Sequence, residues 1–72
     1  MDKLLIEHGL TANIRLLHDI FARAMVDATT AYQDLENCQP RAAVGAVMPL
    51  GQALQDARAL LDAILLLNRQ LD

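Results

Sequence analysis

Residues 10–35 read LTANIRLLHDIFARAMVDATTAYQDL, and their apolar side chains recur at alternating spacings of four and three residues. The expected turn, Asn-Cys-Gln-Pro at residues 37–40, interrupts this pattern, and a second stripe with the same kind of spacing follows. Such spacing places apolar side chains along one face of a helix. The first stripe consists of Leu10, Ile14, Leu17, Phe21, Ala24, Ala28, Ala31 and Leu35, and the second of Val47, Leu50, Leu54, Ala57, Leu61 and Ile64. The sequence therefore predicts an all-α protein, one antiparallel helical hairpin in a single domain of residues 1–72.

The first helix is expected over residues 10–36, after a short lead-in helix at residues 1–9. Counting back from Leu10 along the stripe reaches charged residues, so the apolar side chains of the lead-in segment must point in another direction. Gly9 then marks a break or bend, and Thr11 is the candidate N-cap. One uninterrupted helix is the alternative.

The second helix is expected over residues 41–70. Pro49 lies inside it, where a proline removes one backbone hydrogen bond and its ring presses on the carbonyl group four residues earlier. That carbonyl belongs to Gly45, whose backbone can absorb strain. We therefore predict one helix kinked near residues 45–49, and a clean break at Met48 is the alternative.

The second helix carries a wider apolar surface than one neighbouring helix can cover. Ala53, Leu60 and Leu67 lie beside the stripe that contains Leu54 and Leu61. A single partner helix covers only a narrow seam, so the wider surface requires a further neighbour. We therefore expect a homodimer that forms a four-helix bundle, with the two hairpins parallel or antiparallel. The expected interface residues are Leu10, Ile14, Leu17, Phe21, Leu54, Leu61 and Ile64.

The charge pattern disfavours nucleic-acid and membrane surfaces as partners. The net charge is −3, and the six basic side chains are scattered along the chain. Charges alternate in sign along one edge of the first helix from Arg15 to Asp27, so each possible phosphate contact has a carboxylate beside it. The densest apolar stretch, residues 60–67, contains Asp62 and is too short to span a membrane. We expect neither specific nucleic-acid binding nor a membrane partner.

The expected compartment is the cytoplasm. The first residues lack the basic segment, apolar run and cleavage site of a signal peptide. Cys38 is the single cysteine, so it cannot form an internal disulfide. We expect it to be a reduced thiol, and an intermolecular disulfide is the alternative.

No group of residues predicts catalysis or metal binding. His8 and His18 are ten residues apart, about 15 Å along a helix, so they cannot share a metal within one chain. Cys38 has no histidine close in the hairpin to act as a base. We therefore expect a protein that is not an enzyme, with no catalytic residue, cofactor or metal.

The closing stretch GQALQDARALLDAIL at residues 51–65, within the layout of residues 10–70, resembles the small two-helix antiactivators of bacterial quorum sensing, phage-encoded anti-quorum-sensing proteins among them. Members of that family dimerise through their hairpins and sequester a LuxR-type transcription regulator. The resemblance implies a protein–protein interaction module, an inhibitor that occludes the DNA-binding surface of a bacterial transcription regulator.

The net negative charge suits a basic, DNA-reading partner surface. The candidate partner-binding residues are Asp19, Asp27, Tyr32, Asp34 and Glu36. One alternative is a structural or assembly subunit of a phage or another multiprotein complex. The other is an RNA-binding helical hairpin, because the predicted architecture is similar to that of helical-hairpin regulators of plasmid copy number.

Overall fold

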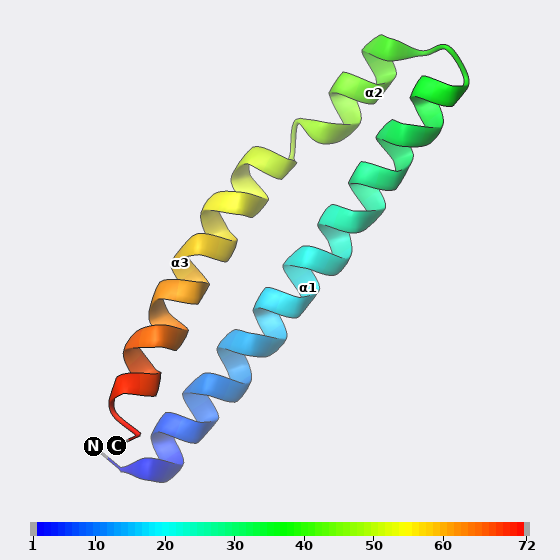
Figure 1. Ribbon diagram of the computed structural model, residues 1–72. Coiled ribbons are helices and arrows are strands. Elements are labelled where there is room, and N and C mark those ends of the chain that lie inside the picture. The colour runs from blue at the N-terminus through cyan, green and yellow to red at the C-terminus, as the bar shows by residue number, and fades with distance from the viewer. Residues whose placement is uncertain (1, 72) are drawn as a thin grey trace.

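The computed structural model describes residues 2–71, so residues 1 and 72 of the predicted domain lie outside the described part of the chain. It contains three helices in the order α1 (Lys3–Glu36), α2 (Pro40–Val47) and α3 (Leu50–Arg69), and no strand within residues 2–71. The first arm of the hairpin is α1, and α2 and α3 together form the second arm, which runs back along it (Figure 1). The molecule is a narrow rod with extents of 54 × 15 × 13 Å. The all-helical class and the packing of the two arms are thus confirmed.

The first arm is one uninterrupted helix, so the predicted break at Gly9 is wrong. The N-cap of α1 is Asp2, whose carboxylate accepts a hydrogen bond from the Leu4 N–H at 3.1 Å. Thr11 lies inside the helix and donates to the carbonyl oxygen of Glu7 at 2.9 Å. Gly9 serves close packing instead, because a Cβ atom at this position would lie 3.1 Å from a methyl group of Leu67 on α3.

A Schellman motif ends α1 at the hairpin tip. Cys38 has a φ of 59°, the left-handed conformation that usually falls to glycine at this position of the motif. Its N–H donates to the Leu35 carbonyl oxygen at 3.0 Å, and the Gln39 N–H donates to the Asp34 carbonyl oxygen at 2.8 Å. These two bonds satisfy carbonyl groups that the helix end would otherwise leave without partners. Pro40 then occupies the first turn of α2, where its missing N–H costs nothing.

The second arm is interrupted at Met48 and Pro49, so the predicted single helix kinked near residues 45–49 is wrong, and the structure has the alternative, a break at Met48. Both residues keep right-handed helical dihedral angles, so the chain direction changes little. Pro49 has no N–H to donate to the carbonyl group four residues earlier, and the regular hydrogen bonds end there. They resume where the Ala53 N–H donates to the Pro49 carbonyl oxygen at 3.1 Å.

We call the buried and half-buried contact line between the two arms the seam. On α1 the seam is rotated by one residue from part of the predicted stripe. Both sides of the seam keep the alternating spacing, but α1 presents Asn13 and Ile20 to the second arm where Ile14 and Phe21 were expected. The buried and half-buried positions that keep this spacing are Ile6, Leu10, Asn13, Leu17, Ile20, Ala24, Asp27, Ala31 and Asp34 on α1, and Ala43, Ala46, Leu50, Ala53, Ala57, Leu60, Ile64, Leu67 and Leu71 on the second arm; Gly9 and Ala63 are half-buried beside them. Half of the predicted first stripe therefore lies outside the seam.

Candidate protein-interaction surface

The displaced half of the first stripe forms an exposed apolar surface beside the seam. Phe21 is 53% exposed and Leu54, next to it on α3, is 64% exposed. Ile14 and Leu61 lie one heptad from these residues on their respective helices and therefore share their side of the hairpin. Met25 follows Phe21 by one helical turn. We define these five residues, all of them exposed, as the apolar face.

The apolar face has a relief of one ridge between two hollows. Phe21 and Leu54 are the two residues that line both hollows, so they form the ridge. The tip-side hollow, toward the hairpin turn, has a volume of about 310 Å³, and the terminus-side hollow has about 250 Å³. The tip-side hollow is lined by Ile20, Phe21, Ala24, Met25, Ala28, Leu50, Ala53 and Leu54, and the terminus-side hollow by Leu17, Phe21, Leu54, Ala57, Arg58 and Leu61.

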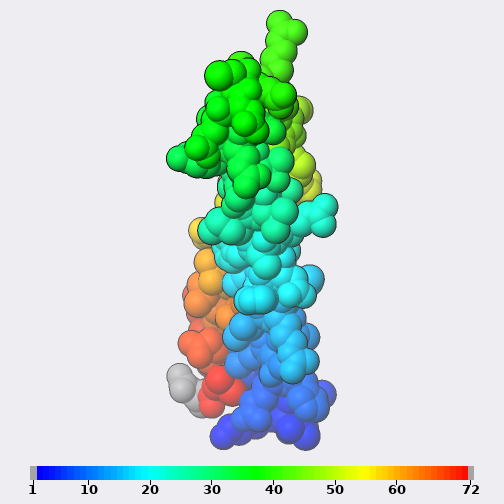
Figure 2. Space-filling model, turned by 90° about the vertical axis from the view of Figure 1, so that its right-hand side faces the viewer, coloured from blue at the N-terminus to red at the C-terminus, as the bar shows by residue number. Residues whose placement is uncertain are grey.

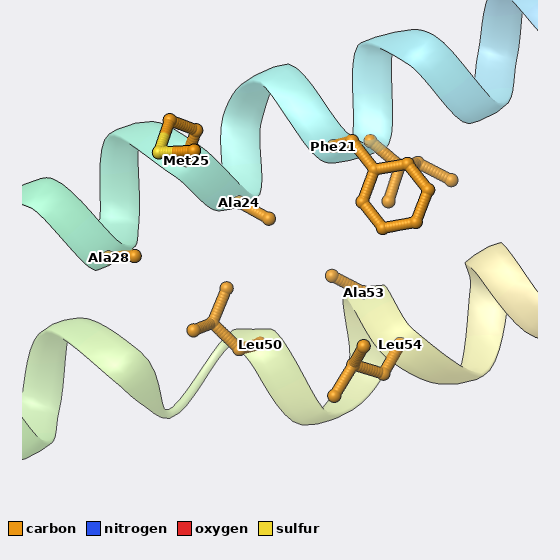
Figure 3. Close-up of a pocket in the computed structure, with 8 residues that line it drawn as sticks. Phe21, Ala24, Met25, Ala28, Leu50, Ala53 and Leu54 are labelled. Carbon is orange, nitrogen blue, oxygen red and sulfur yellow. The ribbon is translucent and has the colours of Figure 1, made fainter.

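Small side chains line part of the tip-side hollow. Three of the lining residues are alanines with short side chains, Ala24, Ala28 and Ala53. The larger side chains of Phe21 and Leu54 stand at one end of the space between α1 and α3 (Figure 3). Every lining residue is apolar. The hollow thus offers apolar contact and no hydrogen-bonding side chain.

The predicted interface residues fall into two groups. Ile14, Phe21, Leu54 and Leu61 lie on the exposed apolar face. The others, Leu10, Leu17 and Ile64, are half-buried in the seam between the arms. A second molecule on this side of the hairpin would therefore contact the first group directly and the second group only at its edges.

The candidate partner-binding residues do not converge on one surface. Asp27 lies in the seam, with its side chain 23% exposed and its carboxylate 3.8 Å from the Arg23 guanidinium, and Asp34 is also half-buried there. Asp19 is exposed and its carboxylate lies 3.3 Å from the ring of His18. Tyr32 is 65% exposed, and Glu36 is exposed at the end of α1. The four carboxylates are thus divided between the seam and the exposed surface of α1, the helix on the side of the rod that faces the viewer in Figure 2.

Sequence reasoning missed the residues that shape the tip-side hollow. Met25, Ala53 and Leu50 line it, and none of them was a candidate for the interface. A signal was present, because Met25 follows Phe21 by four residues and Leu50 precedes Leu54 by four. What the spacing could not give is the hollow itself, which depends on how closely the two arms approach.

Among residues 2–71, no three histidine, cysteine, aspartate or glutamate side chains lie where they could hold a metal ion together. Within the same range, no helix combines the length and apolar character needed to cross a membrane. No protein-family model matches the chain, and neither a curated protein nor a solved structure matches it.

Proposed function

We propose that this chain is a protein–protein interaction module that works as a homodimer, with two hairpins joined through their apolar faces into a four-helix bundle. The observation that carries the proposal is the amount of surface left uncovered. The hairpin exposes 5562 Å². A compact monomer of its mass, 7.9 kDa, exposes only about 4,400 Å².

The excess is of the size that a stable dimer buries. It amounts to about 1,150 Å², and a standard protein–protein interface covers about 800 Å² on each partner. The apolar face is suited to such an interface, since five of the exposed large apolar side chains lie together on one side of a thin rod. Covering each of them contributes up to about 1.5–3 kcal/mol.

The interior of the isolated hairpin is small, which also supports association. The buried side chains of the described residues are Ile6, Ala31, Ala43 and Ala57, and three of these four are alanines. Small domains that cannot bury enough apolar surface commonly gain stability by oligomerisation. A second copy supplies the missing apolar contacts without any cofactor.

We further propose that the dimer is an inhibitor that sequesters a bacterial transcription regulator of the LuxR type and occludes its DNA-binding surface. The resemblance to two-helix antiactivators and the net charge of −3, which complements a basic DNA-reading surface, support this activity. Exposed carboxylates such as Asp19 and Glu36 remain outside the apolar face and are available to such a partner.

Two measurements test the proposal. Sedimentation equilibrium at micromolar concentration is expected to give a helical dimer, and a stable helical monomer would overturn the homodimer. Affinity capture from bacterial lysate, with mass spectrometry, is expected to recover a DNA-binding regulator, and adding the purified protein should then release that regulator from its operator in a gel-shift assay. Recovery of capsid or tail components alone would instead indicate an assembly subunit.

A further inference from the structure

We propose that the two copies dock antiparallel, with their hairpin tips at opposite ends of the bundle, so that the ridge of each copy fills the tip-side hollow of the other. The ridge is Phe21 and Leu54, and the hollow lies beside it toward the turn. This inference rests on the proposed homodimer and specifies its arrangement, which the sequence leaves open.

The ridge is displaced from the centre of the hollow along the rod. Phe21 and Ala28, at the two ends of the tip-side hollow, are seven residues apart on α1. At 1.5 Å per residue this is about 10 Å. The ridge and the centre of the hollow are therefore at different levels of the same face.

The symmetry of a dimer decides whether ridge and hollow can meet. A twofold axis parallel to the rod leaves every level unchanged, so it places ridge against ridge and hollow against hollow. A twofold axis perpendicular to the rod, between the ridge and the hollow, exchanges their levels and places each ridge in the partner's hollow. In such an interface, residue i contacts j and j contacts i. Only this second arrangement fills the void, and an unfilled void loses the contacts of the atoms that line it.

The tip-side hollow suits this role better than the terminus-side hollow. It is larger, at about 310 Å³ against 250 Å³, and all its lining residues are apolar. An apolar protein cavity of about 150 Å³ already holds a benzene molecule, so a phenylalanine ring has room. The terminus-side hollow includes Arg58, whose guanidinium lies 3.2 Å from the Asp62 carboxylate. Covering that ion pair would remove charged groups from water at a cost that the tip-side hollow does not impose.

The hairpin tips provide the test of the arrangement. Cys38 is the only cysteine, it is exposed, and it lies at the turn. The proposed symmetry axis lies between Phe21 and Ala24, at least 14 residues before Cys38. At 1.5 Å per residue, each Cys38 is about 20 Å from the axis, so the two Cys38 residues of an antiparallel dimer are about 40 Å apart or more. In a parallel dimer the tips share one level, and their separation is at most the width of the bundle, roughly 25 Å.

The experiment uses the natural chain with a nitroxide spin label on Cys38, and pulsed electron paramagnetic resonance measures the distance between labels. A dimer with a distance of about 40 Å or more, from the helix rise, supports the inference. A dimer with a distance below roughly 25 Å, the bundle width, overturns it and leaves the homodimer standing. A monomer at concentrations where the natural chain should associate overturns both.

A matched pair of substitutions tests the filling of the hollow. Ala28 is exposed and lines the tip-side hollow, whereas Ala22 is exposed on the same helix and lines neither hollow. Ala28→Trp occupies the space meant for the partner's ridge, and overpacking of this kind is expected to raise the dimer dissociation constant roughly tenfold or more. Ala22→Trp should leave it unchanged. Equal dissociation constants for the two variants would overturn the inference.

Discussion

Replacing Phe21 by alanine is expected to weaken self-association by roughly three to four powers of ten, a value that follows from its exposure. Phe21 is 53% exposed in the isolated hairpin. A covered phenylalanine side chain buries roughly 200 Å², so about 100 Å² of Phe21 remains for a second copy to cover. At about 25 cal/mol per Å² this is about 2.5 kcal/mol for each copy, or about 5 kcal/mol for a dimer in which both copies carry the change.

Leu16→Ala is the matched control for this prediction. Leu16 is 52% exposed and lies on the same helix, but it lines neither hollow of the apolar face. Sedimentation equilibrium over a range of concentrations gives the dissociation constants, and circular dichroism at each concentration reports the helix content. If Leu16→Ala weakened the dimer as much as Phe21→Ala, or if neither did so, the assignment of the apolar face as the interface would be refuted.

Four further substitutions test the local structure by thermal and denaturant unfolding at one fixed protein concentration. Cys38→Gly should stabilise the hairpin by about 0.5–1 kcal/mol, because glycine adopts the left-handed conformation at the tip without strain. The greater conformational entropy of glycine in the unfolded chain offsets only part of this gain. A lower melting temperature would contradict the prediction. Pro49→Ala should restore the missing backbone hydrogen bond and stabilise the second arm by about 1–3 kcal/mol. The helical signal in circular dichroism should increase. An unchanged spectrum would contradict the view that Pro49 causes the break. Gly9→Leu should lower the free energy of unfolding by about 1–3 kcal/mol, because the new side chain overpacks against Leu67. Gly51→Ala is the matched control, since its new methyl group meets open space, and it should raise the free energy of unfolding by about 0.5–1 kcal/mol. A change of the same sign in both variants would contradict the close-packing role of Gly9.

The helical class and the turn were predictable because they depend on local pattern. Alternating spacings and the breaker at residues 37–40 are visible in the sequence and are sufficient for a hairpin. The predicted end of the first helix at residue 36 agrees with the structure, since α1 ends at Glu36. Pro49 correctly marked the weak point of the second arm, but local rules could not decide between a kink and a separation into two helices.

The face that each arm turns toward the other was not predictable from hydrophobicity alone. The seam of α1 includes Asn13, Asp27 and Asp34, which are polar, and leaves the more apolar Ile14 and Phe21 outside. Asn13 is accommodated because its side-chain amide donates to the Gly9 carbonyl oxygen at 2.7 Å. A stripe wider than one seam has two possible phases, and contacts between the arms select one of them.

Counting back along the wrong phase also caused the error at the start of α1. From Leu10, a step of three residues reaches a charged residue, whereas a step of four reaches Ile6. Ile6 is 1% exposed and is the most buried large side chain among the described residues. The apparent loss of the stripe before Leu10 suggested a break that the continuous helix does not have.

The near absence of an interior has a consequence for the abundance of the protein in a cell. In the proposed homodimer, a hairpin whose buried side chains are one isoleucine and three alanines would gain much of its stability from the second copy, so its folded fraction would rise with its own concentration. Newly made chains at low copy number would spend more time open and exposed to proteases, while chains above the dissociation constant protect one another. Degradation would thus remove the protein fastest when it is scarce, giving a threshold in its accumulation rather than a proportional response to synthesis.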